Sequence, residues 1–348
     1  MKPLIAASTR EGAGKTSLLI GLSRAIGERI GYIKPFGDRP LYRKKRLWDV
    51  DAALFLTLLE LDSEPETASI GFDHSKLRYT YDRDSAFDAL RERLAVAGSG
   101  RDLVLIEGGK DLSYGASVSL DPLTISKELE APVLIVAGGS DDAIADDLAF
   151  VKRFVGTDEA CVAGAIINKV THPEDFRETY LPQIEALGID VLGVIPHHEE
   201  LTTRSVSTIA DRLFARVLAG EAGLSNTVRN VAVGAMSVHA AMSDGLIGAP
   251  GKLVITSGDR SDMILAAIDA GGTSGIVLSN NIVPPPNVIA RASEAGVPLL
   301  LVPGDTYAVA LQIERIEPLL TAADEEKLAL LTDLVKTHVD LSAVKAHL

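Results

Sequence analysis

The sequence is short of cysteine, of basic residues and of long apolar runs. The single cysteine, Cys161, excludes an intramolecular disulfide and a metal site built from cysteines. The 34 Lys and Arg residues against 48 Asp and Glu residues give a net charge of −14, which argues against a general nucleic-acid binder, because such a protein needs a basic face. No uncharged apolar run approaches the ~20 residues that span a bilayer, and the N-terminal apolar stretch is too short for a signal peptide. We therefore expect a cytoplasmic protein that binds neither nucleic acid nor membrane.

Apolar residues, in contrast, make up 47% of the chain, which excludes disorder and allows packed cores. The 348 residues suggest two domains at roughly 100–200 residues each. Apolar runs of strand length alternate with amphipathic stretches of helix length, the pattern of a doubly wound α/β fold with a mostly parallel sheet. The first part predicts strands at 3–7, 30–34, 102–107, 132–137, 161–168 and 190–195, and helices near 15–28, 49–61, 84–97, 141–155, 174–187 and 205–218.

The pattern pauses in small and polar residues near 219–230 and then restarts. About 100 further residues carry their own apolar strands and can hold their own core. We accordingly expect domains at 1–220 and 224–320, followed by a C-terminal helical segment at 321–348. The second part predicts strands near 231–235, 252–256, 275–279 and 298–302, and helices near 236–244, 260–270, 287–295, 306–319 and 322–337.

A glycine-rich turn separates the first expected strand from the first expected helix. Backbone N–H groups of such a turn, together with the helix N-terminus, favour an anionic phosphate. Lys15 would reach the outer phosphates and the Thr16 hydroxyl would ligate Mg²⁺. This arrangement is typical of a P-loop NTPase, for which we expect ATP and Mg²⁺ as cofactors, although Thr9 stands where the motif's first glycine is usual. The residues that we assign to the nucleotide here are Thr9, Glu11, Gly12, Ala13, Gly14, Lys15, Thr16 and Ser17.

Residues 9–16 resemble the modified phosphate loop of dethiobiotin synthetases, which also begins with Thr. Later landmarks follow in the same order, and the resemblance covers roughly residues 1–215. They are Gly31-Tyr32-Ile33-Lys34-Pro35, Asp49-Val50-Asp51-Ala52, Ile106-Glu107-Gly108-Gly109, Asn168-Lys169-Val170 and Gly193-Val194-Ile195-Pro196. The resemblance implies that Lys34 points at the terminal phosphate or a carboxylate substrate, and that Asn168, Lys169 and Pro196 belong to base-recognition segments.

Carboxylates near the loop are candidate magnesium ligands. Glu107 ends an apolar strand, so its side chain emerges at the edge where open α/β sheets bind ligands. Asp51 could face it from the next helix, where it is equally explained as a helix-start residue favoured by the dipole. The resemblance implies Thr16, Asp51 and Glu107 together as the magnesium set, and Asp49 competes with Asp51 for the same role. The basic run at 43–46 is expected to be a mobile, solvated loop or a contact for a phosphate or an acidic partner.

In the second part, Ser257-Gly258-Asp259-Arg260-Ser261-Asp262 and an Ala-rich helix resemble a DRTGG domain. Asp259 can cap that helix, whereas a cation such as Arg260 is unfavourable at a helix start and needs an anion. We expect that anion to be a bound phosphate or a carboxylate across a subunit interface, near the turn at 279–281. The resemblance implies self-association, as a homodimer, and regulatory ligand binding. Asp259, Arg260 and Asp262 are therefore candidate regulatory residues.

A dethiobiotin-synthetase-like domain followed by a DRTGG domain resembles the N-terminal half of long phosphate acetyltransferases, in its stand-alone form. Two functions compete: a nucleotide-binding regulatory protein, with another metabolic enzyme as a candidate partner, and an ATP-dependent carboxylate-activating ligase. The phosphate loop serves both, so an organic-substrate pocket would separate them. The segment Glu107-Gly108-Gly109-Lys110-Asp111 departs from the synthetase pattern Glu-Gly-Ala-Gly-Gly. We therefore favour the regulatory function, without acetyltransferase chemistry and with slow ATP hydrolysis as an open alternative.

Overall fold

The computed structural model describes residues 1–43, 45–61, 63–156 and 162–347, so Cys161 lies outside the described residues. Contacts divide the chain into one unit of residues 1–197 with 320–348 and another of residues 198–319. This division differs from the expected boundaries in two ways. Residues 198–220 group with the second unit, and the C-terminal helical segment groups with the first.

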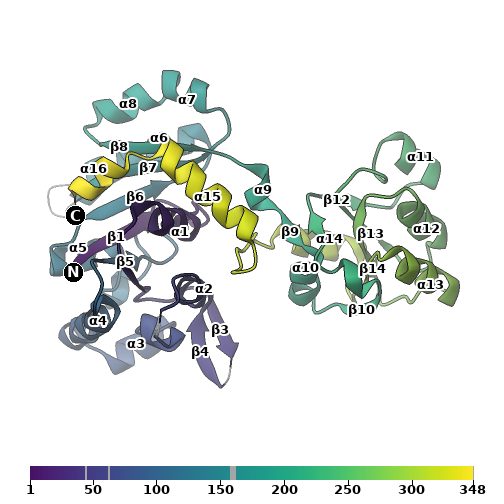
Figure 1. The fold of residues 1–348 in the computed structure, drawn as a ribbon, viewed down its shortest axis with the longest axis horizontal. Coiled ribbons are helices and arrows are strands. Elements are labelled where there is room, and N and C mark those ends of the chain that lie inside the picture. The colour runs from purple at the N-terminus through teal and green to yellow at the C-terminus, as the bar shows by residue number, and fades with distance from the viewer. Residues whose placement is uncertain (44, 62, 157–161, 348) are drawn as a thin grey trace. The chain divides into compact units, whose positions relative to one another are not determined.

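The first unit is built on a six-stranded sheet in the order β2-β5-β1-β6-β7-β8 (Figure 1). Every neighbouring pair is parallel, which confirms the predicted doubly wound architecture and its six strands. Adjacent strands β1 and β5 end side by side, because Ala6 is paired in register with Glu107. The strands are β1 (Lys2–Ser8), β2 (Ile30–Ile33), β5 (Leu103–Glu107), β6 (Val133–Ala137), β7 (Val162–Val170) and β8 (Val191–Pro196).

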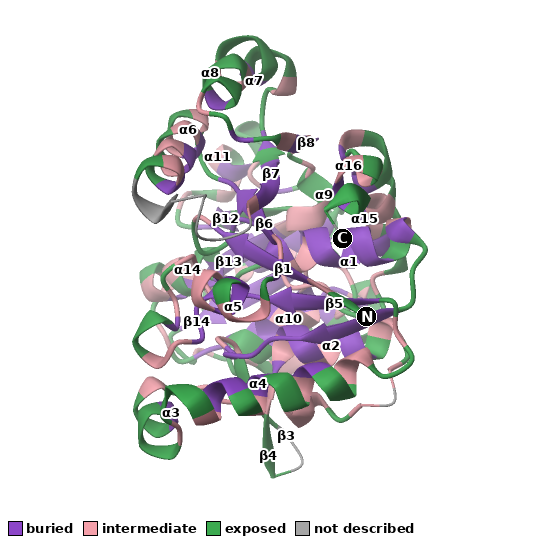
Figure 2. Cartoon of the chain, turned by 90° about the vertical axis from the view of Figure 1, so that its left-hand side faces the viewer, coloured by how far each residue is buried: buried purple, intermediate pink, exposed green. Residues whose placement is uncertain are grey.

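Helices cover both faces of this sheet. On one face α4, α5 and α6 share a core with alternate residues of the strands, among them Ile5, Val104 and Ile135. The central strands are buried along their whole length (Figure 2), as their uninterrupted apolar sequences require. The helices of the unit are α1 (Lys15–Ile26), α2 (Val50–Leu58), α3 (His74–Thr80), α4 (Arg83–Gly98), α5 (Pro122–Leu129), α6 (Asp141–Phe150), α7 (Pro173–Thr179), α8 (Leu181–Ala186), α15 (Glu325–His338) and α16 (Leu341–Ala346).

Helix α15, near the C-terminal end of the chain, lies against α1 (Figure 1). Gly21 permits this close approach, because a Cβ there would lie 2.7 Å from Val335 and 2.8 Å from the Leu331 carbonyl oxygen. Val339, just beyond α15, also bridges to Gly193 of β8. The helix predicted at 322–337 is therefore present and belongs to the core of the first unit.

The second unit has a five-stranded sheet in the order β10-β15-β14-β13-β12. All pairs are parallel except β10 with β15, and the four predicted strands of this part are present. Its strands are β9 (Arg204–Ser205), β10 (Arg216–Ala219), β11 (Thr227–Val228), β12 (Asn230–Val233), β13 (Lys252–Ser257), β14 (Thr273–Ser279) and β15 (Leu299–Leu301), where β9 and β11 form a separate pair. Its helices are α9 (Glu199–Thr202), α10 (Val206–Arg212), α11 (Val238–Ser243), α12 (Ser261–Asp269), α13 (Pro286–Ala295) and α14 (Thr306–Glu314).

Two sequence predictions were wrong in detail, and one element was not predicted. The helix expected at 205–218 ends at Arg212; Phe214 then has φ +50°, and 216–219 pair with β15 as a strand. The helix expected at 174–187 is two helices that meet at Tyr180, ahead of a proline. The basic run at 43–46 lies at the tip of an antiparallel hairpin of β3 (Pro40–Arg43) and β4 (Arg46–Asp49), which the sequence analysis did not predict, and Lys44 of that run lies outside the described residues.

Within the described part of the chain, no helix combines the length and the apolar character that crossing a membrane requires.

Candidate functional site

The glycine-rich turn joins the buried end of β1 to the first residue of α1. Gly12 and Gly14 have φ of +78° and +92°, a backbone region that glycine enters without steric cost. Among the residues that the structure describes, no side chain caps the N-terminus of α1. Its first N–H groups and the helix dipole are therefore available to an anion, as a phosphate-binding loop requires.

Lys15 is the buried cation of the loop. Only 8% of the residue is exposed, and its Nζ donates to Ser8 Oγ at 2.7 Å and to the Lys110 carbonyl oxygen at 3.3 Å. Burial lowers the pKa of this ammonium. Because both hydrogen-bond acceptors are neutral, an anionic ligand beside Lys15 would be strongly favoured.

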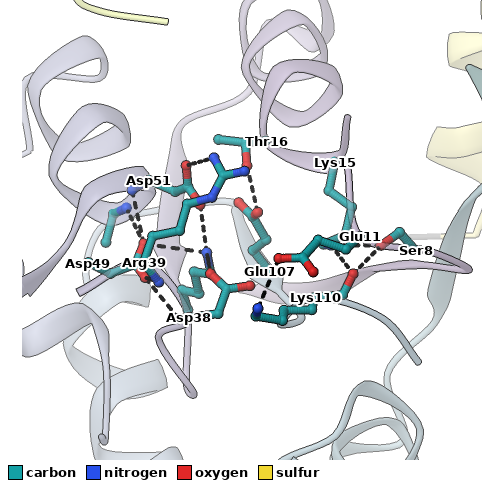
Figure 3. Close-up of polar contacts among 12 residues, drawn as sticks. Ser8, Glu11, Lys15, Thr16, Asp38, Arg39, Asp49, Asp51, Glu107 and Lys110 are labelled. Atoms are coloured by element: carbon teal, nitrogen blue, oxygen red, sulfur yellow. Dashed lines mark hydrogen bonds and ion pairs between the residues drawn. The ribbon is translucent and has the colours of Figure 1, made fainter. Parts of the chain in front are cut away.

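Glu107 lies next to the loop, at the end of β5. Its Oε1 accepts a hydrogen bond from Thr16 Oγ1 and its Oε2 one from Tyr32 Oη, both at 2.8 Å (Figure 3 labels Thr16 and Glu107). The carboxyl is 1% exposed, and burial raises its pKa to about 7. Tyr32 is itself held by a stacked contact with Phe55, whose ring centroid is 4.1 Å away. The sequence thus brings a hydroxyl and a carboxylate together at the start of α1.

Lys34 directly follows the neighbouring strand β2 and is 1% exposed. Its Nζ contacts Asp38 Oδ1 at 2.5 Å, Asp51 Oδ2 at 2.6 Å and Asp49 Oδ1 at 3.4 Å. Burial alone would lower its pKa, but Glu107 and these three aspartates raise it above the usual value. Lys34 is therefore the centre of a buried ionic cluster and not a solvated strand-end lysine.

Asp49 and Asp51 have different tasks in this cluster. Asp49 accepts hydrogen bonds from four backbone N–H groups, which cap α2 and fix the start of the hairpin; the donors are Asp38, Arg39, Asp51 and Ala52. Asp51 instead accepts from two side chains, Lys34 Nζ at 2.6 Å and Arg39 Nη1 at 3.4 Å. Of the two competing residues, Asp51 is thus the one whose hydrogen bonds come from side chains, whereas those of Asp49 come from the backbone.

The described residues fit a hydrated Mg²⁺ better than a cation enclosed by protein ligands. No group of three or more His, Cys, Asp or Glu side chains within the described ranges is placed to hold a metal ion. Mg²⁺ commonly keeps several waters and binds through one or two carboxylates together with nucleotide phosphates. Thr16 and Glu107 lie together as expected, whereas Asp51 is engaged by Lys34.

The candidate base-recognition residues contact the phosphate loop itself. Asn168 Nδ2 donates to the Ala13 carbonyl oxygen and Lys169 Nζ to that of Gly12, both at 2.8 Å. Asn168 is 8% exposed, whereas Lys169 is exposed and has φ +66°. Pro196 ends β8, in register with Val170. The end of β7 thus supports the loop, in a position next to the nucleotide that we expect there.

The sequence analysis missed several residues of this site. Asp38 and Arg39 join the Lys34 cluster, Tyr32 holds Glu107, and Lys110 bonds to the loop through its main chain and its side chain. Two signals were available: Tyr32 lies in one of the matched landmarks, and Lys110 occupies a position where the synthetase pattern has glycine.

In the second unit, Asp259, Arg260 and Asp262 lie around the start of α12. Arg260 Nε and Nη2 bind the Asp262 carboxylate at 2.9 and 3.0 Å, and Nη2 also donates to the Met236 carbonyl oxygen at 3.0 Å. The anion that Arg260 requires is therefore present within the same chain, so an external phosphate or carboxylate is not needed to explain it. Gly258 packs closely against Ile282, which brings the turn after β13 and the turn after β14 together as expected.

Comparisons with known proteins agree with this architecture. The sequence model of the AAA domain family matches residues 2–205 and that of the DRTGG domain residues 208–316. The phosphate acetyltransferase of Pseudomonas putida is 26% identical over 98% of this chain and 51% of its own length, and that of Synechocystis sp. 28% identical over 97% and 50%. The chain therefore spans about half the length of these curated relatives.

Among solved structures, a ParA family ATPase from Chlorobium tepidum matches 58% of this chain and 87% of its own, with 15% identity and a TM-score of 0.38. The CBS and DRTGG domains of the regulatory region of Clostridium perfringens pyrophosphatase match 33% of this chain and 47% of their own, with 21% identity and a TM-score of 0.29. The sequence matches decide the assignment: the chain belongs to the AAA domain family and carries a DRTGG domain after its P-loop domain.

Proposed function

We propose that the first unit binds ATP with Mg²⁺ and that the chain is a cytoplasmic regulatory protein related to the N-terminal part of phosphate acetyltransferases. The observation that carries the proposal is the buried Lys15 ammonium beside an uncapped helix N-terminus, where its hydrogen bonds within the described residues go to the neutral oxygens of Ser8 and Lys110. The Thr16–Glu107 pair beside it supplies the oxygen ligands of a hydrated Mg²⁺. Bound Mg²⁺ would neutralise phosphate charge.

In this proposal the nucleotide is held by the loop and by residues at the ends of three strands. Lys15 would bind the outer phosphates, and Lys34 would release Asp51 as phosphate and Mg²⁺ enter. Asn168, Lys169 and Pro196 would border the base. The second unit would sense a regulatory ligand or mediate homodimer formation, through Asp259, Arg260 and Asp262, and a metabolic enzyme is the partner that we propose for the assembly.

A calorimetric panel of ATP, ADP, GTP and AMP on the full chain, with and without Mg²⁺, tests this proposal. We expect binding of ATP that requires Mg²⁺ and is abolished by Lys15→Ala. Lys345→Ala is the matched control, because Lys345 makes an exposed ion pair with Glu28 at 3.6 Å. Unchanged ATP binding by Lys15→Ala would refute the site.

One observation favours the second candidate function, an ATP-dependent ligase that activates a carboxylate. A cavity of about 460 Å³ opens beside Thr9, at the start of the phosphate loop. Its wall combines the apolar side chains of Leu112, Leu123 and Val151 with polar residues, among them Asp111, Asp121 and Asp147, and its size fits a small organic acceptor. Assays for dethiobiotin and acetyl-phosphate synthesis separate the two functions. Turnover well above that of Lys15→Ala in either assay would refute the regulatory proposal.

A further inference from the structure

The segment after Glu107 carries a lysine that the proposed nucleotide site does not yet use. The Lys110 carbonyl oxygen accepts hydrogen bonds from Ser8 Oγ at 3.0 Å and from Lys15 Nζ at 3.3 Å. The Lys110 ammonium pairs with the Glu11 carboxylate at 2.9 Å (Figure 3). Lys110 therefore contacts the phosphate loop through both its main chain and its side chain.

Close packing holds the main chain of this segment in place. A side chain at Gly108 would overlap Pro122, and one at Gly109 would overlap Tyr114. The Lys110 side chain, in contrast, is 39% exposed and that of Glu11 is 56% exposed. Since an exposed ion pair contributes little to stability, the ammonium can leave Glu11 readily while its main chain stays beside Lys15.

A terminal phosphate would change the electrostatics of this pair. Glu11 belongs to the loop that surrounds the phosphates, so added negative charge there repels its carboxylate and attracts the Lys110 ammonium. A nucleoside diphosphate ends one phosphate short and brings less charge to this position. The pair is thus placed to respond to the length of the phosphate chain.

We propose that Lys110 binds the terminal phosphate of a nucleoside triphosphate by exchanging its Glu11 partner for that phosphate, and so distinguishes triphosphate from diphosphate. The inference rests on the proposed nucleotide binding. Lys15 binds both nucleotides in this scheme, whereas Lys110 adds a contact that only the triphosphate makes.

The test is calorimetric titration of ATP and ADP, each with Mg²⁺, into the full-length wild type, Lys110→Met and Lys110→Arg. A charge-assisted hydrogen bond to phosphate predicts that Lys110→Met lowers ATP affinity about tenfold. We expect its ADP affinity to stay near the wild-type value, and Lys110→Arg to keep most of the ATP preference. Lys345→Met should change neither affinity.

Glu11→Gln provides an independent variant at an exposed position. Without the carboxylate, the Lys110 ammonium has no competing partner in the loop, so we expect a higher ratio of ATP to ADP affinity. An unchanged ratio in Lys110→Met, whether both affinities fall together or neither falls, would overturn the inference alone. A wild type that binds neither nucleotide would overturn the proposed function and this inference with it.

Discussion

Removing the Lys34 ammonium should destabilise the first unit far more than removing an ordinary lysine. Lys34→Met preserves the length and apolar stem of the side chain but leaves Asp38, Asp49 and Asp51 without their common cation. Breaking a buried ion pair in this way typically costs about 3–5 kcal/mol. The folded protein can instead keep one of the three aspartates protonated. Protonating an aspartate of ordinary pKa, near 3.9, costs about 1.4 kcal/mol for each pH unit above that pKa. We therefore expect a loss of about 3 kcal/mol at pH 6 and about 5 kcal/mol at pH 8.

Urea unfolding followed by tryptophan fluorescence measures this loss. Trp48 is the single tryptophan of the chain and lies in β4, so its signal reports on the first unit. The double variant Lys34→Met with Asp51→Asn removes one of the carboxylates that lost its cation. It should regain about 1–2 kcal/mol of unfolding free energy relative to Lys34→Met alone. Lys345→Met, at an exposed pair, should stay within about 0.5 kcal/mol of wild type. A loss below about 1 kcal/mol for Lys34→Met, or one independent of pH, would refute the reasoning.

Three further predictions concern other parts of the chain. Burial raises the pKa of Glu107 from 4.5 to about 7. The stability that this pKa shift contributes is complete below pH 4.5 and is lost as the pH rises through 7. In urea unfolding without nucleotide, Glu107→Gln should therefore be more stable than wild type by about 1 kcal/mol at pH 5 and about 3 kcal/mol at pH 8. An equal difference in stability at both pH values would contradict this. Gly21→Ala should lower urea stability by about 1–3 kcal/mol, because its Cβ would press on the Leu331 carbonyl; no loss would show that α15 packs differently. Arg260→Ala should weaken homodimer formation in sedimentation velocity, whereas an unchanged profile would leave Arg260 only its contacts with Asp262 and the Met236 carbonyl oxygen.

The central parallel strands of both sheets could be predicted because such strands are apolar on both faces. Residues 103–106 read as such a strand, and they are fully buried in β5. The segment 216–219 could not be recognised in the same way, because a short edge strand continues the amphipathic pattern of the helix before it. Its strand conformation depends on pairing with β15, which is distant in sequence.

The loop and its carboxylates could also be placed from the sequence, since the ends of parallel strands meet at one edge. What the spacing could not decide was the competition between Asp49 and Asp51. The Asp49 carboxylate accepts hydrogen bonds from backbone N–H groups that come together around it only when the hairpin and α2 are folded. The hairpin of β3 and β4 was not predicted, because its short strands flank a basic run whose charge pattern does not show that Arg46 pairs with Glu66.

The most direct test of the central claim is a thermal-unfolding comparison of wild type and Lys15→Ala with and without Mg·ATP. Nucleotide at about 100 times its dissociation constant adds ~2.7 kcal/mol to the stability of a chain that binds it. We predict that wild type gains a corresponding increase in Tm only when Mg²⁺ and ATP are both present, and that Lys15→Ala, compared with its own Tm in their absence, gains none. An equal increase in both proteins would contradict the assignment of the phosphate loop as the nucleotide site.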